Sequence, residues 1–192
     1  MPQNAIIKAD GTGDYVTFND WFVAEALSDY GEPTRCYIFG TVNAGANIIF
    51  NSAGGTWPNN WQVRAFPGQE YNGANHTACA RITHTASALE FANIDADVQD
   101  IAVGVTGGYN VEPIKISNGV SATARRKITL KRLYLESSPF YHGSSYTAEF
   151  NTATPASGAG SQYELDFEDI VIYSRASNRG IYISGRADNN SF

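Results

Sequence analysis

Charged residues are scarce in this sequence, and most of those present are acidic. Asp, Glu, Lys and Arg make up 17% of the 192 residues, against about 25% in a typical globular protein. The 13 basic and 19 acidic side chains give a net charge of −6, so the sequence lacks the basic surface of a nucleic-acid-binding protein. Its one basic cluster, within residues 125–132, is interpreted as a solvated turn and strand face. We therefore expect no nucleic-acid partner.

Long apolar runs and metal-binding motifs are also missing. No stretch approaches the ~20 apolar residues of a membrane-spanning helix, and no basic-then-apolar leader precedes the first predicted strand. We expect neither a membrane span nor a Sec signal. Cys36 and Cys79 are the two cysteines and make no metal motif; we interpret both as small buried residues, with a disulfide as the alternative. The three histidines share no metal-ligand spacing, so neither a metal nor a cofactor is predicted.

The sequence does contain an eight-residue repeat. The segments ADVQDIAV, ITLKRLYL and LDFEDIVI align without gaps at residues 96–103, 128–135 and 165–172. Positions 1, 3, 6 and 8 are apolar in all three octets, and position 5 is Asp, Arg and Asp in turn. Two alternating pairs around a short interruption predict a strand, a bend and a second strand, with both strands pointing apolar side chains into one interior.

A second set of short alternating segments advances in step with the octets. These segments start at residues 88, 113, 147 and 180. Their starts are 25, 34 and 33 residues apart, and the octets start 32 and 37 residues apart. Two markers that advance together by about one unit indicate a solenoid that adds one coil per repeat.

The fold prediction has one rival. A β-sandwich also consists of short strands with frequent turns, but it has no reason to repeat an octet with the same internal bend. We therefore predict an all-β fold, a right-handed parallel β-helix, with octet residues stacked in columns inside it. The predicted interior residues are Val98, Ile101, Val103, Leu130, Leu133, Leu135, Phe167, Ile170 and Ile172.

The N-terminal segment predicts a cap for this stack. A polar turn, ADGTGDY at residues 9–15, follows a short apolar run, and Thr17 with Asp20 makes a start similar to a capping box. A helix over residues 17–30 would then present a stripe at helical spacing. That stripe holds Phe22, Val23, Ala26, Leu27 and Tyr30. We divide the single domain into residues 1–33, a strand, turn and capping helix, and residues 34–192, the coils.

The segment IIKADGTGDYVTFNDWFVAEAL, residues 6–27, resembles the entry segment of the pectin lyase-like superfamily. Pectin methylesterases and many phage or bacterial β-helix proteins of that superfamily begin with a similar strand, a G-x-G-D-[YF] turn, a Thr and a capping helix. The resemblance implies the β-helix fold. It does not imply a reaction, because one fold carries many functions.

The catalytic motifs of the esterases in that superfamily are not matched. Cys36 stands where the resemblance would place the nucleophilic aspartate, and Asp100 of the QDI segment lies at a repeating bend position. A glycosidase would need two carboxylates about 5–9 Å apart, for which the candidates are Asp97, Asp166 and Glu168. Because basic residues occupy the octet between them, we interpret these acids as part of a stabilising charge ladder between coils.

Aromatic residues at predicted loop tips are candidates for binding a sugar or a protein partner. They are Trp57, Trp61, Tyr109 and Tyr141. The first functional hypothesis is a non-enzymatic structural or adhesive module of a phage-like virion, such as a tail spike, fibre or capsid decoration. Its partners would be a surface glycan, other copies of itself in a homo-oligomer such as a trimer, or another virion protein, with Ile181, Ile183 and Phe192 near a contact. The alternative is a depolymerase or lyase that acts on a polysaccharide.

Overall fold

The computed structural model describes residues 4–25, 33–46, 48–51, 61–92, 94–107, 111–117, 125–137, 146–151, 162–173 and 179–184. These residues form one helix and fourteen strands in two sheets. Each strand pairing recorded among them is parallel. The mostly-β class is confirmed, and the pairing is that expected of a parallel solenoid.

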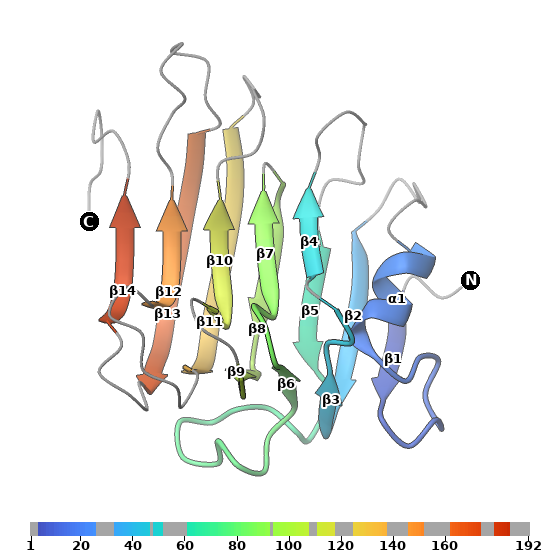
Figure 1. Ribbon diagram of the computed structural model, residues 1–192. Helices are drawn as coiled ribbons and strands as arrows, with labels where there is room; N and C mark the ends of the chain where they lie inside the picture. Colours follow the sequence, from blue (N-terminus) through green and yellow to red (C-terminus); the bar gives the residue numbers. More distant parts are fainter. Residues whose placement is uncertain are drawn as a thin grey trace.

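The two sheets take their strands from alternate stretches of the chain. The first sheet holds β1 (Asn4–Lys8), β2 (Thr34–Phe39), β3 (Thr41–Asn43), β5 (Trp61–Ala65), β6 (Arg81–His84), β8 (Ala96–Gln99), β9 (Ala102–Val105), β11 (Arg125–Glu136) and β13 (Gln162–Tyr173). The second holds β4 (Ile48–Asn51), β7 (Leu89–Ala92), β10 (Ile114–Ser117), β12 (Tyr146–Asn151) and β14 (Arg179–Ser184). Figure 1 shows them as two layers that build up in order from the N-terminal to the C-terminal end.

The octet alignment predicted from the sequence is the register of the first sheet. Ile128 pairs with Ala96 on one side and Leu165 on the other, so the first positions of the three octets are neighbours. The eighth positions, Val103, Leu135 and Ile172, also lie side by side. On β11 and β13 the strand continues through the interruption, whereas β8 and β9 are separate strands on either side of it.

At position 5 the backbone adopts the same left-handed conformation in all three octets. Asp100, Arg132 and Asp169 have φ values of 65°, 49° and 52°, in the left-handed region. Asp tolerates this region better than most residues, whereas a long side chain such as Arg adopts it at a cost. The predicted bend is therefore confirmed, and it uses ordinary residues where a glycine would be least strained.

The predicted interior is confirmed on two coils and is only partly covered on the third. The side chains of Val98, Ile101, Val103, Leu130, Leu133 and Leu135 are 0% exposed. Those of Phe167, Ile170 and Ile172 are partly buried and pack against the same core. The difference arises because, within the described chain, β13 has a strand neighbour in the first sheet on one side, which is β11.

The predicted helix is present as α1 (Phe18–Glu25), with residues 26–32 outside the described part of the chain. Its start has the predicted capping box: the amide of Asp20 donates to Thr17 Oγ1, and the amide of Thr17 donates to Asp20 Oδ2, both at 3.1 Å. Satisfying these two amides stabilises the first turn.

The predicted buried stripe of the helix is wrong at Val23, whereas Phe22 packs against the core as predicted. Phe18, Trp21 and Glu25 are buried, Phe22 is partly buried, and Val23 is 63% exposed. Ala26, Leu27 and Tyr30 lie outside the described residues. The helix is rotated toward Trp21, because the Trp21 ring meets the edge of the Trp61 ring at a centroid distance of 5.2 Å and covers the end of the core.

The turn before the helix closes the free edge of β1. The amide of Ile6 donates to Asp14 Oδ2 at 2.8 Å, and the amide of Asp14 donates back to the Ile6 carbonyl at 2.8 Å. The amide of Lys8 donates to the Tyr15 carbonyl at 2.9 Å. Gly13 is required here because a Cβ would lie 2.7 Å from the Ile6 carbonyl oxygen. The turn thus takes the place of a further strand at this edge.

Candidate functional site: the outer face of the first sheet

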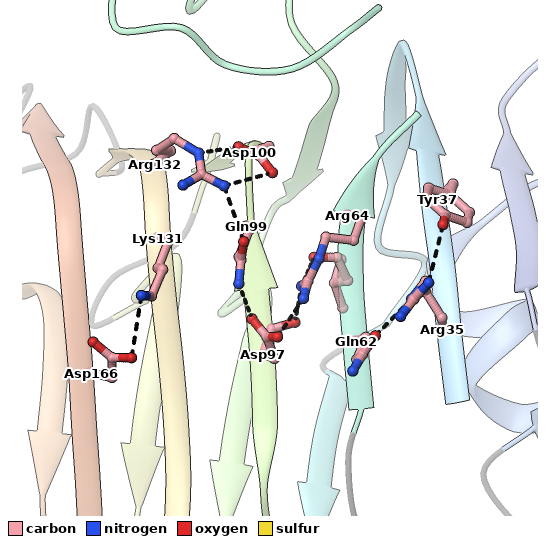
Figure 2. A network of polar contacts seen from close by, with 11 residues as sticks. Arg35, Tyr37, Gln62, Arg64, Asp97, Gln99, Asp100, Lys131, Arg132 and Asp166 are labelled. Atoms are coloured by element: carbon pink, nitrogen blue, oxygen red, sulfur yellow. Dashed lines mark hydrogen bonds and ion pairs between the residues drawn. The ribbon is translucent and has the colours of Figure 1, made fainter. Parts of the chain in front are cut away.

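The candidate carboxylates lie on the outward face of the first sheet, in columns set by the register. One column carries Arg35, Gln62, Asp97, Thr129 and Asp166 on successive strands. The adjacent column carries Tyr37, Arg64, Gln99, Lys131 and Glu168. We call these two columns the outer ladder; Figure 2 shows most of its members linked across the strands.

Both carboxylate oxygens of Asp97 have a partner side chain. Arg64 forms an ion pair with Oδ2 and also donates to the Asp97 carbonyl at 2.8 Å. Gln99 Nε2 donates to Oδ1 at 2.7 Å (Figure 2). The side chains of Arg64 and Asp97 are 18% and 19% exposed. A partly buried, charge-assisted pair of this kind fixes the strand neighbours β5 and β8 in register.

Asp166 and Glu168 share one cation. Lys131 Nζ lies 3.4 Å from Asp166 Oδ2 and 2.9 Å from Glu168 Oε2. The hydrogen bond to Glu168 is the main reason that the pKa of Lys131 is raised, and Asp166 adds to the shift. Lys131 therefore stays protonated between the two acids.

The bend adds a further ion pair next to the outer ladder. Arg132 Nε donates to Asp100 Oδ1 at 2.5 Å, and its terminal nitrogen donates to Asp100 Oδ2 at 3.2 Å and to Gln99 Oε1 at 3.1 Å (Figure 2). The bond to Asp100 is the largest cause of the raised pKa of Arg132. The predicted acidic, basic, acidic order between coils is confirmed, with bases on β11 held between acids on the β8 and β13 sides.

Each candidate carboxylate is paired with a base rather than with another candidate carboxylate. Asp97 and Asp166 flank Thr129, two strand spacings apart, which is roughly 9.5 Å at the backbone. The Asp97 carboxylate is also turned toward Arg64, on the side away from Asp166. Asp166 and Glu168 lie on one strand and bind the same ammonium.

A second cluster, which the sequence did not predict, lies beside the outer ladder. We call it the aromatic cluster, and it consists of Tyr71, His76, Tyr134 and Tyr173. The imidazole of His76 stacks on the Tyr134 ring at 4.6 Å, and Tyr173 stacks near Tyr134 at 6.3 Å. Tyr134 is buried, whereas Tyr173 is 49% exposed. The cluster therefore ends in an accessible ring at the edge strand β13.

The aromatic cluster is fixed by a partly buried ion pair. Arg81 donates to Glu136 Oε2 and to the His76 carbonyl, both at 2.6 Å, and its guanidinium lies 5.9 Å from the centre of the Tyr134 ring. Burial raises the pKa of the Tyr134 phenol, and the charge of Glu136 adds to the shift. The outward position of Tyr134 follows from the octet pattern, but its partners come from the loop before β6, where no periodic signal exists.

Of the four aromatic residues proposed for ligand binding, Trp61 is the one that lies among the described residues. Trp61 begins β5 and is 0% exposed, so the prediction that its ring lies at an accessible loop tip is wrong; it packs in the core beneath α1. Trp57, Tyr109 and Tyr141 lie outside the described residues. Phe192 does too, and Ile181 and Ile183 lie on β14.

Neither a metal centre nor a disulfide is found within the part of the chain that the structure describes. No group of three or more His, Cys, Asp and Glu side chains there is arranged to hold a metal ion. Cys36 and Cys79 are both free and buried, which confirms the interpretation as small buried residues. Burial raises the pKa of both thiols, so they stay protonated and unreactive at neutral pH.

Comparison with known proteins adds no relative. No protein-family model, curated protein or solved structure matches the chain. No helix among the described residues has the length and apolar character needed to cross a membrane.

Proposed function

We propose that this protein is a non-enzymatic structural or adhesive module of a phage-like virion. The observation that carries the proposal is the state of the candidate carboxylates: Asp97, Asp166 and Glu168 are each held in an ion pair with a base on a neighbouring strand. A nucleophile or general base needs a carboxylate directed at substrate. Here the carboxylates join coils instead, which suits a rigid rod or platform.

The finer fold assignment belongs to the same proposal. We propose a right-handed parallel β-helix of the pectin lyase-like kind, in a tail spike, fibre or capsid decoration. Parallel strands joined by crossovers are right-handed in ~98% of cases. The resemblance of residues 6–27 to the superfamily's entry segment and the cap that this segment forms over the core support the assignment.

The ligand of such a module would meet the outer face. Tyr173 offers an exposed ring on which a sugar could stack, and farther along the same strand the side chains of Asp166 and Glu168 are 39% and 51% exposed. A surface glycan is therefore one partner class. Other copies of the chain, for example in a trimer with side-by-side packing, or another virion protein form the second.

A binding assay with a matched activity assay tests the proposal. The purified protein is applied to an array of bacterial surface polysaccharides, and each glycan bound is then assayed for new reducing ends and unsaturated products. Binding without product formation is expected, with weaker binding by Tyr173→Ala and no change in Val23→Ala, whose side chain is exposed on α1. Product release that disappears in Asp166→Asn or Asp97→Asn would instead establish a polysaccharide-acting enzyme.

A further inference from the structure

The edge strand β13 has an unusual composition for an edge. It carries four acids, Glu164, Asp166, Glu168 and Asp169, and no Lys or Arg. Its neighbour β11 carries five bases and one acid. Natural proteins usually protect a sheet edge with charged side chains, most often lysine, or with proline, bulges or a covering element. In β13 the row of like charge is half-exposed: Glu164 is paired with Lys127, and Asp166 and Glu168 share the ammonium of Lys131.

The interior side of the same strand is incompletely covered. The inner column Val98, Leu130 and Phe167 runs through three strands, and its first two members are 0% exposed while the third is only partly buried. Ile170 and Ile172 repeat this pattern beside Leu133 and Leu135. A strand added to β13 in the same parallel sense would bury this apolar row.

We infer that the outer edge of β13 binds a basic strand of another protein by β-sheet augmentation. From β5 to β13 the outward charge alternates from strand to strand: Arg64 binds Asp97, Asp100 binds Arg132, and Lys131 binds Asp166 and Glu168. The next strand in this order carries Lys or Arg at alternate, outward positions and apolar side chains at the inward ones. Backbone hydrogen bonds would supply affinity, and the charged row would select the partner.

A second copy of this chain does not fit the edge. Two β13 strands paired with each other would bring their acidic rows together, and like charges on neighbouring strands are destabilising. A head-to-tail stack would need the outer edge of β1, whose Ile6 and Lys8 backbone groups are already bound to Asp14 and Tyr15. The inference rests on the proposed binding role and names the partner's chemistry at this edge.

The test uses the full chain and a synthetic peptide with the β11 sequence, residues 125–136, because that strand already complements β13. Binding is measured by fluorescence anisotropy. Two control peptides are a scrambled version of the same residues and the acidic β13 sequence, residues 162–173. The β11 peptide should bind, and both controls should fail to bind.

Matched variants of the protein separate the effect of the acidic row on binding from the effect of net charge. Asp166→Asn with Glu168→Gln should weaken binding about tenfold by removing two charge pairs. Asp10→Asn with Glu70→Gln removes the same charge from exposed turns and should leave binding unchanged. Equal binding by the scrambled peptide, no binding by the β11 peptide, or full binding by the Asp166/Glu168 variant would overturn the inference.

Hydrogen exchange of the full chain identifies any other occupant. The β13 amides should gain protection when the β11 peptide is added. If they are already fully protected without peptide, then another part of the chain or a second copy covers the edge, and the inference is wrong. This result is independent of the glycan assays, so failure of either proposal leaves the other interpretable.

Discussion

The two ends of the strand stack are built in opposite ways. At the first end, the turn of residues 10–15 binds the backbone edge of β1, and Trp21 of α1 lies buried over the core. At the other end, the β13 core row remains partly exposed and its outward face presents Asp166, Glu168, Val171 and Tyr173. Among the described residues, the β1 edge is capped and the β13 edge is not.

The difference shows that apolar burial and backbone pairing are separate problems at a sheet edge. At the first end they are solved by separate elements: Trp21 and Phe18 cover side chains, while Asp14 and Tyr15 satisfy backbone groups. An added strand would solve both at once at β13, because it brings a backbone ladder and an apolar row together. Substitutions at matched positions can test each half of this comparison.

The largest effect is expected at the helical cap. Trp21→Ala should destabilise the fold by about 3–5 kcal/mol, because a fully buried ring is lost. Trp21→Phe should cost much less, since it keeps an aromatic contact with Trp61 and removes an indole N–H with no hydrogen-bond partner in the described structure. Urea unfolding measures both; Val23→Ala, at an exposed helix position, is the control. Equal losses for Trp21→Ala and Val23→Ala would show that α1 does not cover the core.

A smaller difference should separate equivalent core positions on the last two coils. Leu133 and Ile170 are register partners, but Leu133 is 0% exposed and Ile170 is only partly buried. Leu133→Ala should cost about 2–5 kcal/mol, and Ile170→Ala should cost clearly less, because its site is already partly hydrated. The free energies of unfolding in urea provide the comparison. A loss at Ile170 as large as that at Leu133 would mean that the end coil is covered in solution.

The backbone half of the comparison is tested at Gly13. Gly13→Ala places a Cβ 2.7 Å from the Ile6 carbonyl oxygen, so the turn must move away from β1 at a cost of about 1–3 kcal/mol. The exposed edge should then promote association, which light scattering detects. Gly107→Ala is the control, since its Cβ would make ordinary contacts of 3.5 Å or more. A stable monomeric Gly13→Ala protein would rule out a role for the turn in protecting the edge.

The coils were predictable from the sequence, and the cap over the first end was only partly so. The octets gave the register residue by residue, because apolar side chains at positions 1, 3, 6 and 8 share one interior. The bend at Asp100, Arg132 and Asp169 was visible as an interruption of that alternation. These signals are local and repeat, so the pattern of one strand predicts the pattern and the register of its neighbour.

The helix face and the aromatic cluster depend on contacts that leave no periodic signal. Apolar residues lie on more than one side of α1, and the position of Trp61 decides that Trp21 rather than Val23 is buried. His76 reaches Tyr134 from an irregular loop. The candidate acids were found on the correct face, but only the register showed which base each one binds.

The smallest expected effect is a difference in pH response between the two ends. Hydrogen bonds from Thr12 and the nearby Lys8 lower the pKa of Asp10 from 3.8 to about 2. Its contribution to stability is therefore present above pH 3.8 and is lost as the pH falls toward 2. At β13 the sign is reversed. The pKa of Lys131 is raised above its usual 10.5, chiefly by Glu168, so its contribution is present below pH 10.5 and is lost as the pH rises through the higher folded value.

Two variants should separate these responses in thermal unfolding. Asp10→Asn should flatten the acid limb of the curve of melting temperature against pH and leave the alkaline limb unchanged, because Asn still accepts the Thr12 hydrogen bonds without titrating. Lys131→Met should do the reverse, because it removes the cation between Asp166 and Glu168. Both groups are near the surface, so each change should be small and should shrink as salt is added. If Lys131→Met left the alkaline limb and its salt dependence unchanged, the β13 acids would not depend on this cation, and the outer ladder would contribute no measurable stability at that edge.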